Sequence, residues 1–138
     1  MPMSDTTLFS VIESSAHPNF APLYRRLNIH EVRLNSIRKA LAQLKKQAPD
    51  FLVAEFFYGY RNNYAGANIS NLDVLLSTLQ KYAPGARVIV MVDKAEFPYV
   101  EALNRLFPLH AVFTFPVQEE RMEAALTADM SGAGSVDP

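Results

Sequence analysis

Residues 49–57 of the chain read Pro-Asp-Phe-Leu-Val-Ala-Glu-Phe-Phe. A proline and an acid precede a short apolar run without polar alternation, and the run carries one carboxylate near its end, Glu55. This pattern is typical of a parallel strand that is buried on both faces. In an open α/β sheet, ligands and reacting groups collect beyond the carboxyl ends of the strands, so Glu55 is the first candidate site residue.

Four further runs predict the other strands of the same sheet. Residues 7–13 and 86–93 are apolar runs that also end on an acid, and both are expected to be strands. The imperfect alternation of residues 28–34 suits an edge strand with one wetter face. Residues 110–115 form the last predicted strand.

Amphipathic helices are predicted after each strand. Pro18 and Pro22 favour a helix start in the first of them. Asn35 or Ser36 is expected to cap the second, which Pro49 ends. The expected ranges, in chain order, are 17–27, 36–48, 70–83, 97–107 and 116–128.

The third and fourth helices carry the clearest core positions. Ser70 with Asp73 three residues later resembles a capping box in which aspartate replaces the usual glutamate. Val100, Leu103 and Leu106 are expected to face inward from the fourth helix. The buried face of the third helix is predicted to consist of Leu72, Leu75, Leu76 and Leu79.

Strands and helices therefore alternate along the chain with short connections. Right-handed crossovers place helices on both faces of a parallel sheet, which predicts a three-layer αβα sandwich. Five strands imply the flavodoxin-like order 2-1-3-4-5. In that order the strands ending at Glu13, Glu55 and Asp93 are neighbours, so three carboxylates are expected at one end of the sheet. We expect one domain over residues 1–128 and a flexible tail over 129–138.

Composition restricts the partners of the chain. The 138 residues include 13 Lys and Arg against 14 Asp and Glu, and the net charge of −1 gives no general attraction for nucleic acid or anionic lipid. The absence of cysteine excludes disulfides, thiolate nucleophiles and sulfur-rich zinc sites. The first residues do not resemble a signal peptide, and no run approaches a membrane-spanning length, so a cytoplasmic protein is expected.

Several short motifs occur in an order that resembles one known family. Residues 49–55 give a proline, an aspartate, an apolar run and an acid, residues 100–103 read Val-Glu-Ala-Leu, and Phe115-Pro116-Val117 follows the last strand. In this order and spacing they resemble the receiver (CheY-like) domains of bacterial response regulators. The resemblance extends from about Thr7 to Ala128. It implies that Glu55 occupies the position of the phosphoacceptor aspartate.

The resemblance also implies a pocket that has lost most of its reactive groups. Phe115 stands where the family has a lysine, before the position of a cis-proline. Glu13-Ser14 keeps one acid of a magnesium-binding pair, and neither Val92 nor Asp93 supplies the family's hydroxyl group. The positions of this degenerate pocket are Glu13, Ser14, Val92, Asp93, Phe115 and Pro116.

These departures predict that Glu55 does not accept a phosphoryl group. Phosphoryl transfer needs a carboxylate held in line, a fixed cation and positive charge on the equatorial oxygens. Glu55 is one methylene longer than aspartate, and misplacing a reacting atom by about 1 Å can lower a rate on the order of a hundredfold. We therefore expect no enzymatic activity.

The acids Glu13, Glu55 and Asp93 have three possible roles. In the first, they are solvated strand ends whose charges are screened separately. Alternatively, they form a weak site for Mg²⁺ or Ca²⁺, which prefer carboxylate oxygens. As a third alternative suggested by the family alone, Glu55 permanently imitates a phosphorylated aspartate.

The segment from Tyr58 to Asn68 is rich in tyrosine and in residues that tolerate turns. Amphipathic rings and planar donors are typical of recognition surfaces, and the rings could stack on a nucleotide or another aromatic ligand. The alternative is a loop whose tyrosines cover the end of the sheet. The candidate recognition residues are Tyr58, Tyr60, Arg61, Asn62 and Tyr64.

The remaining residues that could bind a metal or catalyse a reaction are interpreted as structural. His17, His30 and His110 lie far apart in the sequence without the spacing of metal ligands, and we interpret them as structural histidines. No glycine-rich phosphate loop and no nucleophile elbow is present. We expect no cofactor.

The sequence thus predicts a non-catalytic pseudo-receiver in bacterial signal transduction that acts through contacts with a protein partner or as a homodimer. The resemblance implies contact through the fourth helix, fifth strand and fifth helix, near Phe97, Tyr99, Phe107 and Phe113. The alternative is a small flavodoxin-like enzyme, or a ligand- or metal-binding protein, that uses the three acids and the tyrosine-rich segment.

Overall fold

The computed structural model describes residues 6–58 and 70–128, and these residues form a five-stranded parallel sheet of order β2-β1-β3-β4-β5. This order confirms the prediction. The strands are β1 (Thr7–Val11), β2 (His30–Leu34), β3 (Phe51–Phe56), β4 (Arg87–Val92) and β5 (Ala111–Thr114). The central strand β3 is buried at every position, as expected for a strand covered on both faces.

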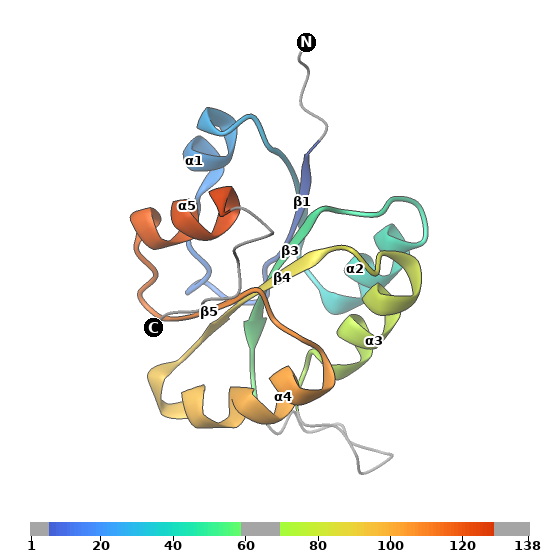
Figure 1. Cartoon of the computed structure of the whole chain (residues 1–138), viewed down its shortest axis with the longest axis vertical. Coiled ribbons are helices and arrows are strands. Elements are labelled where there is room, and N and C mark those ends of the chain that lie inside the picture. Colours follow the sequence, from blue (N-terminus) through green and yellow to red (C-terminus); the bar gives the residue numbers. More distant parts are fainter. Residues whose placement is uncertain (1–5, 59–69, 129–138) are drawn as a thin grey trace.

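Helices cover both faces of the sheet and complete the predicted three-layer sandwich (Figure 1). One face carries α1 and α5, while the other carries α2, α3 and α4. The helical segments are α1 (Ala21–Arg26), α2 (Ile37–Leu44), α3 (Asp73–Tyr82), the 3₁₀ helix η1 (Lys94–Tyr99), α4 (Val100–Leu106) and α5 (Glu119–Thr127). Within the described residues, no helix is long and apolar enough to cross a membrane.

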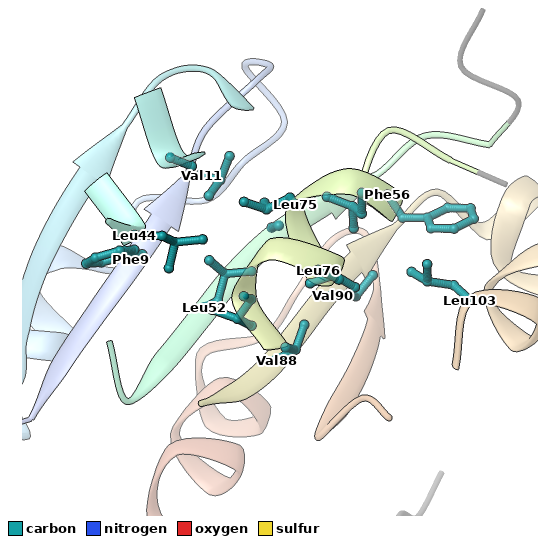
Figure 2. Close-up of a cluster of buried hydrophobic side chains, with 14 of the residues drawn as sticks. Phe9, Val11, Leu44, Leu52, Phe56, Leu75, Leu76, Val88, Val90 and Leu103 are labelled. Carbon is teal, nitrogen blue, oxygen red and sulfur yellow. The ribbon is translucent and has the colours of Figure 1, made fainter. Parts of the chain in front are cut away.

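Alternate residues of the strands feed two hydrophobic clusters. Phe9, Leu52 and Val90 point toward α2, α3 and α4, where they meet the leucines of α3 (Figure 2). Leu8 and Val53, one position away, point to the opposite cluster under α1 and α5. The predicted buried face of α3, formed by Leu72, Leu75, Leu76 and Leu79, is confirmed.

Two predicted helix starts are refined by the structure. Ser36 caps α2 by accepting a hydrogen bond from the Lys39 N–H at 3.1 Å. Ser70 stands three residues before the first residue of α3, and its N–H donates to Asp73 Oδ1 at 2.7 Å, which is the backward bond of a capping box. The predicted pairing of Ser70 with Asp73 is therefore present.

The first helix is shorter than predicted. It begins at Ala21 rather than at residue 17, with Pro22 in its first turn, so Pro18 lies before it. Strand β1 also ends at Val11, before the acid that was expected to close it. Residues 12–20 therefore form a long connection at the carboxyl end of β1, beside the end of β3.

The predicted helix over 97–107 is divided between η1 and α4. The prediction that Leu106 faces inward was wrong. Val100 and Leu103 are buried, but Leu106 is 55% exposed. The helical period explains the error, because each step of three residues falls about 60° short of a full turn. Two such steps carry Leu106 to the side of α4, away from the face that Val100 begins.

Candidate functional site

Glu55 is fully buried, with 0% of its surface exposed. It lies on β3 opposite Met91 of β4, one residue before the last residue of the strand. The interpretation as a solvated strand end is therefore wrong for this residue. A carboxylate in such a place is tolerated only if its oxygens are well hydrogen-bonded.

The connection 12–20 supplies four hydrogen-bonding groups to this carboxylate. The backbone N–H groups of Glu13 and Ser14 donate to Glu55 Oε2 at 2.6 and 3.2 Å. The Ser14 hydroxyl donates to Glu55 Oε1. The Nδ1 atom of His17 lies 3.2 Å from Glu55 Oε2, and the His17 side chain is 3% exposed. Both oxygens of Glu55 are thus engaged by the protein itself.

A tight turn brings His17 back toward β3. The His17 N–H donates to the Ser14 carbonyl at 3.3 Å, and the Ala16 N–H donates to Ser14 Oγ at 3.1 Å. Ser14 therefore closes the turn and also binds Glu55. The interpretation of His17 as a structural histidine did not include this contact with Glu55.

These contacts set the protonation of Glu55. Burial alone raises the pKa of the Glu55 carboxyl group, because it disfavours the charged form. The hydrogen bonds from His17, Ser14 and the Glu13 backbone act in the opposite direction, and the net pKa is below the ordinary 4.5. Glu55 is accordingly a carboxylate at neutral pH.

Asn71 joins the site to the start of α3. Its Nδ2 donates to Glu13 Oε1 at 2.8 Å and to the Glu55 carbonyl oxygen at 2.9 Å. Its Oδ1 accepts the Phe57 N–H at 2.7 Å. Asn71 is buried and holds the ends of β1 and β3 at a fixed separation. No sequence motif marks Asn71 as a site residue.

The pKa of Glu13 is shifted in the opposite direction from the pKa of Glu55. Burial raises its pKa above the ordinary 4.5, the hydrogen bond from Asn71 lowers it, and the negative charge of Glu55 raises it further. The net pKa is raised. The two acids are neighbours, as predicted, but only Glu55 has a surrounding that favours its charge.

The predicted rim of three acids is not formed. Asp93 is exposed, and its carbonyl oxygen accepts the Glu96 N–H at the start of η1. Among residues 6–58 and 70–128, no group of three or more His, Cys, Asp or Glu side chains could hold a metal ion. The sheet order brings the strand ends together, but Glu13 and Asp93 lie beyond the ends of β1 and β4, and the three carboxylates do not form one cluster.

The other pocket positions offer no charge. Phe115 is half-buried and packs against the cluster under α1 and α5, and its bond to Pro116 is cis. Val92 is buried in the opposite cluster. The other histidines lie elsewhere: His110 Nε2 contacts the Ala125 carbonyl at 2.8 Å, and His30 is exposed on β2.

Tyr58 is the described residue of the candidate recognition segment. Its ring stacks on Tyr99 with centroids 3.8 Å apart and planes at 10°. Its N–H donates to Glu96 Oε1 at 3.0 Å, and it forms an antiparallel bridge with Ser70. Tyr60, Arg61, Asn62 and Tyr64 lie outside the described residues.

Several solved structures that match this fold are response regulators or receiver domains. No family model and no curated relative matches the chain. A response regulator from Burkholderia pseudomallei, solved with a phosphorylated aspartic acid and a calcium ion, is 19% identical with a TM-score of 0.59, covering 92% of this chain and 69% of that one. A receiver domain protein from Clostridium thermocellum is 12% identical with a TM-score of 0.63 over 88% and 90% of the two chains. Chemotaxis protein CheY4 of Vibrio cholerae is 10% identical with a TM-score of 0.66 over 89% and 97%. These likenesses establish the CheY-like fold.

Proposed function

We propose that the chain is a non-catalytic signalling module of the receiver fold, which binds other proteins and does not accept a phosphoryl group on Glu55. One observation carries this proposal. The Glu55 carboxylate has no exposed surface, and both of its oxygens already accept hydrogen bonds from residues 13–17. A phosphodonor would have to displace these contacts before it could reach the oxygen in line.

The groups that would stabilise a transferred phosphoryl group are also replaced. His17 Nδ1 lies 3.2 Å from Glu55 Oε2 and occupies the space beside the carboxylate that an incoming phosphoryl group would need. Phe115 packs in the α1/α5 cluster at the position that the family resemblance gives to lysine. A phosphoryl group on Glu55 would therefore lack its cationic partner, and electrostatic stabilisation is the main contribution that such a site makes to catalysis.

A receiver fold that is not phosphorylated keeps its site in a single conformation. The contacts among His17, Glu55, Glu13 and Asn71 tie β1, β3 and α3 together without an added group. We infer a constitutive role in two-component-like signalling in the bacterial cytoplasm, through a protein partner or a homodimer. The α4, β5 and α5 surface remains the proposed contact, with Phe107 and Phe113 half-buried near it.

The alternative of a metal- or ligand-binding protein built on the three acids has less support. Glu55 is fully buried, whereas Asp93 is exposed and does not join Glu13 and Glu55. Divalent cations prefer several convergent oxygen ligands. Calorimetry with Mg²⁺ and Ca²⁺ should show no saturable heat at millimolar metal.

Intact-mass spectrometry after incubation with acetyl phosphate and Mg²⁺ tests the proposal. We expect no adduct of about 80 Da, the mass of one phosphoryl group. A receiver domain with an aspartate acceptor, treated in the same tube, controls for the activity of the reagent. An adduct that disappears in Glu55→Gln would refute the proposal.

A further inference from the structure

The segment that follows β4 exposes aromatic rings. None of the residues of η1 is buried, and within it Phe97 is 48% and Tyr99 is 43% exposed. Tyr58, which stacks on Tyr99, is 46% exposed. Single exposed apolar residues are ordinary, but aromatic rings gathered at the carboxyl end of a sheet are typical of a contact surface.

The stacked pair is held rigidly by the backbone. The Tyr58 N–H is bound to Glu96 of η1, and the bridge between Tyr58 and Ser70 fixes the end of β3. The Glu96 N–H donates to the Asp93 carbonyl at 2.8 Å, which fixes the start of η1. Ring faces that are ordered in advance lose little conformational entropy when a partner binds.

Acidic residues accompany these rings in the segment that follows β4, where Lys94 is also exposed. Asp93 is exposed and makes no capping hydrogen bond with its side chain. Glu96 lies against Tyr58, and Glu101 follows on the first turn of α4, where it pairs at 3.8 Å with Arg105. The face of an aromatic ring is also electronegative, so rings and carboxylates together attract a cation.

We propose that Tyr58 and Tyr99, with the carboxylates of Asp93 and Glu96, form the docking surface for an arginine side chain of a protein partner. This inference deepens the proposed function, on which it rests, by naming the chemistry of the partner. Arginine fits better than lysine because its planar guanidinium stacks on a ring and donates to a carboxylate at the same time. The acids Asp93, Glu96 and Glu101 outnumber the cations Lys94 and Arg105 in this segment, which disfavours nucleic acid and anionic lipid.

The chain also offers a cationic surface of its own. The outward face of α2 and its C-terminal end carries Arg38, Lys39, Lys45 and Lys46, all exposed. A second copy could place this face on the aromatic surface, and such a contact between two different surfaces would produce closed rings or open assemblies of the chain. A second copy of the chain is therefore the alternative occupant, and the experiment must distinguish it from a protein partner.

The test measures the binding of a fluorescent peptide of alternating arginine and serine to the full chain, beside a matched lysine–serine peptide. We expect saturable binding of the arginine peptide, and binding about three- to fivefold weaker for Tyr99→Leu, which keeps apolar area but removes the ring face. Asp93→Asn should weaken binding about twofold at low salt. Tyr82→Leu and Glu120→Gln are the matched controls, because Tyr82 is 45% exposed on α3 and Glu120 is exposed on α5.

Each outcome decides for or against the docking surface. Arginine-selective binding that depends on Tyr99 and Asp93 but not on Tyr82 or Glu120 supports it. Equal binding of both peptides, no binding, or equal loss in the control variants overturns it. Concentration-dependent association of the free chain that Tyr99→Leu abolishes also overturns it, because a second copy then occupies the surface. The result is independent of phosphorylation of Glu55, so failure of one proposal does not produce failure of the other.

Discussion

Replacing His17 with alanine tests the role of the buried pair with Glu55 directly. The substitution removes the imidazole that lies 3.2 Å from Glu55 Oε2 and leaves the carboxylate with three donors, from Glu13 and Ser14. Losing one hydrogen bond to a charged group costs about 1.5–3 kcal/mol. Because three donors remain, we expect the free energy of unfolding to fall by about 2–3 kcal/mol.

Urea denaturation at neutral pH measures this loss. His30→Ala is the matched control, since His30 is exposed on β2 and its removal should change the unfolding free energy by less than about 0.5 kcal/mol. A double-mutant cycle with Glu55→Gln isolates the pair. His17→Ala should cost about 1–2 kcal/mol less in the Glu55→Gln background than in the natural chain.

Acid titration of stability gives a second readout of the same pair. The pKa of Glu55 is lowered in the folded state, so its carboxylate stabilises the fold fully above the ordinary value of 4.5. That contribution is lost as the pH falls through the lowered pKa. Glu55→Gln should therefore flatten the loss of stability below pH 4.5. The reasoning is refuted if His17→Ala costs the same in both backgrounds, because His17 would then act by packing alone.

Three further comparisons of substituted chains are expected to give distinct results. Asn71→Ala should lower the unfolding free energy by about 2–4 kcal/mol, because the half-buried Phe57 N–H and the buried Glu55 carbonyl lose their partner. Asn104→Ala, at an exposed position of α4, should cost about 1 kcal/mol or less in the same urea titration. Glu13→Gln should raise the urea midpoint at pH 7 and gain less at pH 4, since the raised pKa of Glu13 means that its charge destabilises the fold as the pH rises; an unchanged midpoint at pH 7 would contradict this sign. Leu103→Ala should cost about 2–5 kcal/mol and Leu106→Ala less than about 0.5 kcal/mol, and similar thermal shifts for the two would place Leu106 in the core.

The sheet could be predicted because its information is local. Runs such as 49–57 and 86–93 are apolar without alternation, and the number of strand–helix units then leaves one common strand order. Helix ends were less predictable. Prolines are compatible with several start points, and the first helix begins at Ala21 although Pro18 also suits a first turn.

The contact between His17 and Glu55 was missed for a geometrical reason. It joins residues 38 positions apart through a turn that Ser14 closes, and no pattern in the residues specifies that turn. A signal was nevertheless present. The predicted order places β1 beside β3, so the connection after β1 starts at the same end of the sheet as Glu55. The same argument applies to Asn71, at the start of the helix that follows β3.

The bridge between Tyr58 and Ser70 has a consequence for engineering the chain. It pairs the backbone just beyond β3 with the backbone that leads into α3, and it thereby fixes both ends of the connection between them. Each doubling of the length of such a connection adds only about 0.6 kcal/mol of closure entropy. Foreign sequences, such as an epitope or a short reporter tag, could therefore be grafted between these two anchor points while the sandwich retains its stability.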